Sequence, residues 1–188
     1  MSPFPRLRIA AARVAGRFRG NQRGSAAVEF ALVAPLFFAL LFAIIETGMV
    51  FFASQSLETA LQDSARTIQT GQAQIAKYDK ASFKKDVVCP NVSVLFDCAN
   101  GIYVDVQSYP AGFGSVAISD PITSDPVTGN NFVDSTKYDP GGPGAIVVVR
   151  LFYQWPLFVT GLGYNLANLS GSKRLLAATA AFKNEPYN

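Results

Sequence analysis

Two carboxylates, Glu29 and Glu46, carry the most unusual chemistry in this sequence, because they lie at the two ends of a strongly apolar segment. A charged side chain at the centre of a bilayer helix costs about 2.5–3.5 kcal/mol, and less near the interface. Each glutamate therefore needs a compensating cation, a hydrogen-bond donor or water. Glu46 follows Glu29 by 17 residues, about 25 Å along a helix. We expect Glu46 to reach water near the far interface; contact with a partner helix is the alternative.

The residue types present exclude most catalytic sites. The chain has no histidine, so it lacks the commonest general base and metal ligand, and a Ser-His-Asp or Cys-His site is impossible within it. Its two cysteines are too few for a structural zinc site. The glycine motifs of phosphate-binding and dinucleotide-binding loops and the G-x-S-x-G motif are also missing. We therefore expect a protein that is not an enzyme and holds no cofactor or metal.

The apolar segment predicts a transmembrane helix. Sixteen residues without a charge run from Phe30 to Ile45, and the apolar character continues to Ala53. A helix needs about 20 residues to cross the hydrocarbon core of a bilayer. Pro35 should kink or loosen this helix, which membranes tolerate. The expected domains are a leader over residues 1–24, a transmembrane helix over 25–53 and an outer domain over 54–188.

The charges flanking the apolar segment predict its orientation. Residues 1–24 carry six arginines and no acid, whereas the rest of the chain holds 10 basic and 13 acidic residues. Positive flanks remain in the cytoplasm, so we expect the outer domain in a periplasm or its equivalent. The basic arm offers only Phe4 and Phe18 for base stacking, so we expect no nucleic-acid partner. A cleaved secretory signal is a further alternative, but its apolar core is normally about 7–15 residues, and FFASQS around Ala53 is a poor cleavage site.

The junction between the arm and the apolar segment reads RGSAAVEFALVAPLFF, in which Glu29 is the fifth residue after Gly24 and Phe30 follows. This pattern resembles a type III signal sequence, which a prepilin peptidase cleaves after the glycine while the helix is retained. The form AAVEFALVAP, together with FKNEPY near the C-terminal end, is similar to the TadE-like family of pilus-assembly pseudopilins. The resemblance implies cleavage between Gly24 and Ser25, and packing of Glu29 and Phe30 against other pilin-like helices.

The resemblance also implies a function and partners. The chain would be a minor pilin-like subunit of a Flp-type (Tad, type IVb) pilus, which supports adhesion or secretion, and would cross the bacterial inner membrane once. Its partners would be the prepilin peptidase, a TadF-like subunit, a Flp-like major pilin and the inner-membrane platform. Two other functions remain open: an uncleaved, signal-anchored periplasmic binding or scaffold module, and a membrane-tethered hydrolase with a carboxylate or Ser/Lys site in residues 108–144.

Glu29 has two alternative roles. Cleavage after Gly24 would expose a cationic amine on Ser25, four residues before Glu29. In the packed subunits that the resemblance implies, the carboxylate meets the N-terminal amine of a neighbouring subunit, and each charge compensates the other in a low dielectric. Alternatively, Glu29 favours the positive N-terminal end of its own helix at the level of the lipid headgroups.

Helical spacing of apolar residues continues beyond the membrane segment. Leu57, Leu61 and Ile68 recur at this spacing, and Gly71 is a suitable C-cap. One helix over residues 26–70 would be about 65–70 Å long. We expect its outer apolar stripe to lie in the core of the outer domain; a partner-binding site is the alternative.

The outer domain is predicted to be α+β and pilin-like, with a second short helix over residues 72–86 and a small antiparallel β-sheet packed on the long helix. Alternating patterns rich in β-branched and aromatic residues predict its strands; they cover residues 102–107, 146–155 and 176–182. Cys89 and Cys98 are expected to form a disulfide in an outward-facing compartment, since a redox-active pair would usually be C-x-x-C.

Residues 108–144 are rich in glycine, proline, asparagine, aspartate and hydroxyl residues. We expect a long loop without regular structure that is mobile or contacts another pilus component. The alternative is calcium binding by a set of oxygen ligands, although the spacing of an EF-hand is missing. That set comprises Asp125, Asn130, Asn131 and Asp134.

Overall fold

The computed structural model describes residues 24–92, 95–159 and 164–187. The contacts divide the chain into two units, residues 1–43 and 44–188. Helix α2 (Ser25–Gln69) belongs to both units and is 45 residues long. The sequence-based expectation of one helix over residues 26–70 is therefore confirmed. Pro35 lies inside this helix, and the helix continues through it.

The end of α2 is set by a glycine, as the sequence predicts. Gly71 has a positive φ of 78°, and its amide donates to the carbonyl of Ile68 at 3.0 Å. A left-handed residue after the last turn is a common way to end a helix, and glycine adopts this conformation without a steric penalty.

The predicted single helix over residues 72–86 is wrong, because the segment is divided into short turns of helix. These are α3 (Gln72–Ile75), α4 (Lys80–Phe83), the π-helical turn Lys84–Val88 and α5 (Cys89–Asn91). Lys77 has a positive φ of 55°, which interrupts the helix. Asp79 then caps α4 by accepting from the amide of Ser82 at 2.8 Å, and hydrogen bonding to the Ser82 side chain is the main cause that lowers the pKa of Asp79.

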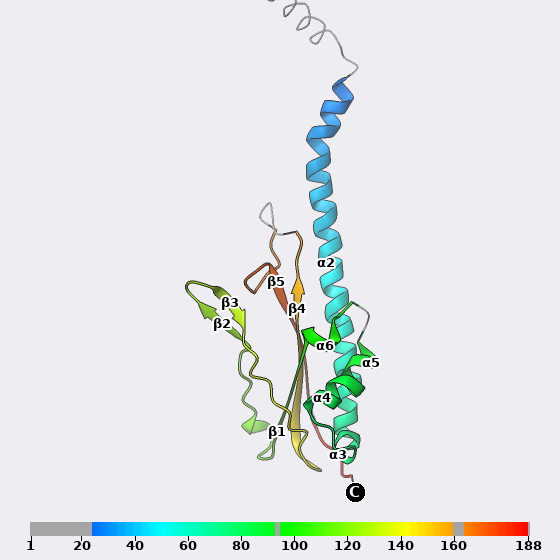
Figure 1. Ribbon diagram of the computed structural model, residues 1–188, viewed down its shortest axis with the longest axis vertical. Helices are drawn as coiled ribbons and strands as arrows, with labels where there is room; N and C mark the ends of the chain where they lie inside the picture. Colours follow the sequence, from blue (N-terminus) through cyan, green and yellow to red (C-terminus); the bar gives the residue numbers. More distant parts are fainter. Residues whose placement is uncertain (1–23, 93–94, 160–163, 188) are drawn as a thin grey trace, which may run out of the picture. The chain divides into compact units, whose positions relative to one another are not determined.

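The sheet has the three strands that the sequence predicts. They are β1 (Ile102–Tyr109), β4 (Ile146–Pro156) and β5 (Lys173–Lys183), and they follow the short helix α6 (Cys98–Gly101) along the chain. β4 is the central strand and is antiparallel to both neighbours (Figure 1). The expected α+β class with a small antiparallel sheet is therefore confirmed.

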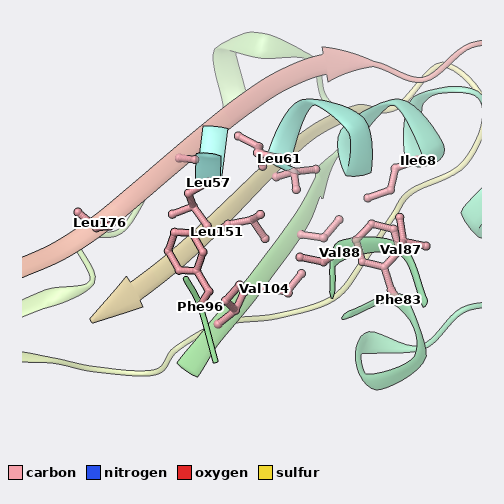
Figure 2. Packing of buried hydrophobic residues seen from close by; sticks show 14 of the residues in the cluster. Leu57, Leu61, Ile68, Phe83, Val87, Val88, Phe96, Val104, Leu151 and Leu176 are labelled. Atoms are coloured by element: carbon pink, nitrogen blue, oxygen red, sulfur yellow. The ribbon is translucent and has the colours of Figure 1, made fainter. Parts of the chain in front are cut away.

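The core of residues 44–188 lies between one face of this sheet and the outer part of α2. Leu57, Leu61 and Ile68 have no exposed surface, and they pack in the same cluster as Val104 and Leu151 (Figure 2). The apolar stripe of α2 is thus intramolecular core. Truncation of a fully buried leucine to alanine typically costs about 2–5 kcal/mol, so this stripe is a major source of the stability of the domain.

The long segment after β1 is not structureless, and in this respect the sequence-based expectation is wrong. It contains a β-hairpin of β2 (Ile122–Asp125) and β3 (Gly129–Phe132). Asp125 forms the turn by accepting from the amides of Val127 and Thr128, both at 2.8 Å. Asn130, from the proposed calcium set, accepts a hydrogen bond from Ser124 on the opposite strand, so two members of that set have roles within the hairpin.

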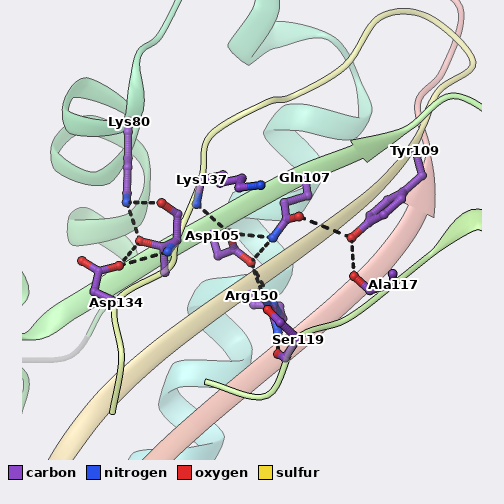
Figure 3. Close-up of polar contacts among 10 residues, drawn as sticks. Lys80, Asp105, Gln107, Tyr109, Ala117, Ser119, Asp134, Lys137 and Arg150 are labelled. Carbon is purple, nitrogen blue, oxygen red and sulfur yellow. Dashed lines mark hydrogen bonds and ion pairs between the residues drawn. The ribbon is translucent and has the colours of Figure 1, made fainter. Parts of the chain in front are cut away.

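A buried ion pair joins this segment to the other face of the sheet. Asp105 and Arg150 are cross-strand partners and are only 1% and 5% exposed. Nη2 and Nε of Arg150 donate to Oδ2 of Asp105 at 2.7 and 2.9 Å. The pair also binds the covering segment, because Oδ1 of Asp105 accepts from the Lys137 amide at 2.7 Å and Arg150 donates to the Ser119 carbonyl at 2.8 Å (Figure 3).

The C-terminal motif binds two distant parts of the domain. Asn184 donates through its side-chain amide to the carbonyl oxygens of Pro140 and Gly142 at 2.9 and 3.0 Å. The Glu185 amide donates to the carbonyl of Gln69 in the last turn of α2 at 2.9 Å. The Tyr187 ring lies so close to Gly71 that a Cβ there would be 2.3 Å from it. The motif therefore joins the end of α2 to the loop before β4.

Substituting Arg150 with methionine should leave the Asp105 carboxylate buried without its cation. Breaking one side of a buried pair is expected to reduce the free energy of unfolding by about 3–5 kcal/mol. The measurement is urea unfolding of the full chain in detergent, followed by the fluorescence of Trp155. The double variant Asp105→Leu/Arg150→Met should recover part of the loss. Lys183→Met, which removes an exposed cation from the same sheet, is the control; an equal effect of both single variants would contradict the importance of the pair.

Gly71→Ala should lower the free energy of unfolding of the domain for two reasons. The left-handed conformation is unfavourable for alanine, and the alanine Cβ would clash with the Tyr187 ring. The conformational part alone is about 1–2 kcal/mol. The same unfolding assay measures the loss, and Gly142→Ala is the matched control, since nothing lies within 4 Å of a Cβ at that position. Adding Tyr187→Ala to Gly71→Ala should relieve the steric part. Similar stabilities of the Gly71 and Gly142 variants would show that the close approach is unimportant.

Candidate membrane and assembly surface

The predicted processing junction lies at the start of α2. The helix begins at Ser25, directly after Gly24. The Ser25 hydroxyl donates to Oε1 of Glu29 at 3.3 Å, one turn further along the helix. Residues four apart lie on the same helix face, so the backbone nitrogen that cleavage would expose and the Glu29 carboxylate belong to neighbouring turns. Phe30, the other predicted packing residue, is exposed.

The first part of α2 presents an apolar surface that the described residues do not cover. The large side chains from Val28 to Ile45 are mostly exposed. Helix α2 contains an 18-residue window that is apolar enough to cross a membrane, and none of that window is buried. A helix of this composition inside a soluble protein would be buried in its core. The exposed surface therefore suits lipid or the helices of other membrane proteins.

Glu46 contradicts its sequence-based expectation. The residue is 7% exposed and does not reach water as predicted. Its Oε1 accepts hydrogen bonds from the amides of Phe158 and Val159 at 2.5 and 3.0 Å, and its Oε2 lies 3.2 Å from the Val159 nitrogen. The carboxylate thus binds the backbone of its own chain, just after β4.

The contacts around Glu46 fix the segment after β4 on the helix. Leu157 is buried in the core, and the next residue on α2, Thr47, shares a hydrogen bond with the Tyr164 hydroxyl. Hydrogen bonds from amides to a carboxylate are charge-assisted and stronger than neutral ones. The helical pattern of the sequence predicts how far along α2 Glu46 lies. The same pattern cannot reveal a hydrogen-bond partner that is 112 residues away in the sequence.

The cysteine pair forms a structural disulfide. Cys89 and Cys98 are bonded, with their Cα atoms 5.6 Å apart. The loop that they close contains Phe96, which is buried and packs edge-on against Tyr153 with ring centroids 4.8 Å apart. The disulfide therefore restrains a loop that supplies a core side chain, and it is expected to stabilise the domain by about 2–4 kcal/mol.

The rest of the described surface offers little chemistry. Among residues 24–92, 95–159 and 164–187, no group of three or more His, Cys, Asp or Glu side chains is placed to hold a metal ion. Three hollows on the described surface are largely open to solvent. One of them runs between the exposed face of α2 and the α5 turn, and its walls include Phe52, Thr59 and Pro90.

Comparison with known proteins identifies the N-terminal part of the chain. A family model described as TadE-like protein matches residues 24–66, which is 43 of the 188 residues. The match begins at Gly24 and contains Glu29, Phe30 and Glu46, so the resemblance to the TadE-like family is confirmed over this segment. No curated protein and no solved structure matches the chain. The disulfide, the sheet and the C-terminal motif lie outside the matched segment.

Replacing Glu46 with alanine should release the backbone after β4, because two amides lose their acceptor. Hydrogen bonds to charged groups contribute about 1.5–3 kcal/mol, so protection of the Phe158 and Val159 amides from hydrogen exchange should fall about 10- to 100-fold. The measurement is NMR or mass-spectrometric exchange on the full chain.

Two further variants complete this experiment. Glu46→Gln keeps an acceptor oxygen and should retain part of the protection. Glu58→Ala removes a carboxylate from the same helix whose recorded partner is Gln62, and it should leave both amides protected. Unchanged exchange in Glu46→Ala would contradict the assigned role of Glu46.

Proposed function

We propose that this protein is a minor pilin-like subunit of a Flp-type (Tad) pilus, anchored by the first part of α2 in the bacterial inner membrane. The observation that carries the proposal is the TadE-like match, which begins at Gly24, on a helix whose first part is apolar and not covered by the described residues. TadE-like proteins are pilus components rather than enzymes, and by this resemblance the chain would have a structural function.

The proposed sequence of events starts with insertion, with the arginine-rich arm in the cytoplasm and residues 54–188 in the periplasm. A prepilin peptidase then cleaves between Gly24 and Ser25. The released helix packs against other pilin-like helices, including those of a TadF-like subunit and a Flp-like major pilin, at the inner-membrane platform. The outer domain would contribute to adhesion or secretion from the assembled pilus.

The start of α2 supports this packing. Glu29 and Phe30 lie on an exposed helix surface, where a carboxylate would be costly in lipid alone. The N-terminal amine of a neighbouring subunit would compensate that charge, and the pair would fix the axial position of one helix relative to the next. The apolar side chains around them, Val28 and Val33, are exposed and could contact such a neighbour.

An uncleaved, signal-anchored periplasmic scaffold is the second candidate function. The same apolar helix would anchor it, and the same restrained outer domain would present a binding surface. The two functions differ in the fate of residues 1–24, which a scaffold would retain.

Gly24→Leu should block processing, because the peptidase that the junction suits requires a small residue at the cleavage site. We expect the wild-type protein extracted from membranes to start at Ser25 when the prepilin peptidase of its host is present, and the variant to start at Met1. Intact mass and N-terminal sequencing measure this directly. Gly20→Leu, which alters another glycine of the leader, should still be processed. A start at Met1 for the wild type, with or without the peptidase, would favour the uncleaved scaffold.

A further inference from the structure

Phe158 has an exposed aromatic side chain, and its backbone amide is hydrogen-bonded within the domain. The residue is 87% exposed, whereas its predecessor Leu157 is buried. Its amide and that of Val159 are bound by the Glu46 carboxylate. The backbone that carries the exposed ring is therefore held by two hydrogen bonds.

The position of Glu46 relates this side chain to the membrane segment. The twenty residues from Ala26 to Ile45 contain one charge, Glu29, and twenty residues of helix are about 30 Å long, the thickness of the hydrocarbon core. A span of this length that starts at Ala26 ends next to Glu46, seven residues before the end of the predicted membrane segment 25–53. Exposed apolar side chains occur before and after Glu46 along the helix, among them Ile45 and Phe51.

We propose that the segment 157–159 lies on the outer surface of the bilayer, with the Phe158 ring inserted at the boundary between headgroups and acyl chains. Glu46 acts as a positioning residue that holds the backbone of this segment. This inference rests on the membrane location given under Proposed function, and it goes beyond it by assigning a second, lipid-contacting surface to the outer domain.

The hydrogen bonds of Glu46 suit a site next to lipid. Backbone amides near the hydrocarbon region need partners within the protein because water is scarce there. The two amides nearest the exposed ring have such a partner, and the carboxylate is itself shielded by them. The neighbouring Tyr164, which bonds to Thr47, adds an amphipathic aromatic side chain of the kind enriched at membrane interfaces.

Tryptophan quenching in bilayers tests the proposal, because the chain has one tryptophan. In a Trp155→Phe background, single tryptophans are introduced by Phe158→Trp, by Phe37→Trp in the apolar helix, and by Phe113→Trp. Phe113 is also exposed, at 62%, but it follows β1 at the end of the sheet where β4 begins. The full chain is reconstituted in nanodiscs of phosphatidylethanolamine and phosphatidylglycerol that carry bromine either near the headgroup or near the end of the acyl chain.

We expect the Phe158→Trp variant to be quenched more strongly by bromine near the headgroup, the Phe37→Trp variant more strongly by deep bromine, and the Phe113→Trp variant by neither. Adding Glu46→Ala to the Phe158→Trp variant should reduce the quenching of its tryptophan. Adding Glu46→Ala to the Phe37→Trp variant should leave the quenching of that tryptophan unchanged. Quenching of Phe37→Trp without quenching of Phe158→Trp would overturn this inference alone.

Two other results would also overturn the proposal. Loss of quenching in the Phe37→Trp variant would remove the membrane location itself, and with it the proposed function. Quenching of Phe158→Trp that disappears when two copies share a nanodisc would assign the ring to contact with a second copy of the chain. The number of copies per disc is therefore varied in the same experiment.

Discussion

The burial of one apolar stripe on α2 is the interaction on which the outer domain depends. Leu57, Leu61 and Ile68 supply the helix side of the core, and strands β1, β4 and β5 supply the other side. A three-stranded sheet has two faces and a single helix covers one of them. The remaining face needs its own cover. The short helices and the disulfide loop add Phe83, Val88 and Phe96 to the core on the first face. Much of the remaining structure can be understood as the consequence of this arrangement.

The second face of the sheet is covered by the long segment between β1 and β4, and this cover is attached through polar groups. Buried charges are tolerated only when they are paired and hydrogen-bonded. The Asp105–Arg150 pair meets this condition and at the same time binds the backbone of Lys137 and Ser119. The C-terminal motif has a comparable function, because Asn184 binds the carbonyl oxygens of Pro140 and Gly142 in the loop before β4 and the Glu185 amide binds the carbonyl of Gln69 at the end of α2.

The helix α2 changes its surroundings along its length. Its first part is exposed and apolar, whereas the stripe in its outer part is buried against the sheet. Glu46 lies where the buried residues of the helix begin, and its carboxylate replaces water as the acceptor for two amides. One helix thus combines a surface suited to lipid or other helices with the central element of a folded domain, which is the division of labour expected of a pilin-like subunit.

The sequence by itself determined the elements whose signals are local. Apolar period and length identified α2, alternation identified the three strands of the sheet, and the cysteine spacing in its context indicated the disulfide. The junction around Gly24 and Glu29 identified the TadE-like segment, which the family match confirms over residues 24–66. These features depend on residues near one another in the chain, so a pattern is enough to reveal them.

Only the tertiary structure decided the roles of Glu46, the Asp105–Arg150 pair and the β2–β3 hairpin. Glu46 was expected in water and binds amides 112 residues away; the ion pair joins residues 45 positions apart. The hairpin was hidden because its strands are short and rich in turn-forming residues, and Ile122 and Phe132 are stabilised by packing with Phe152 on the sheet. The physical reason is the same in each case: hydrogen bonds and packing partners depend on distances in space, which the local periodicity of a sequence does not specify.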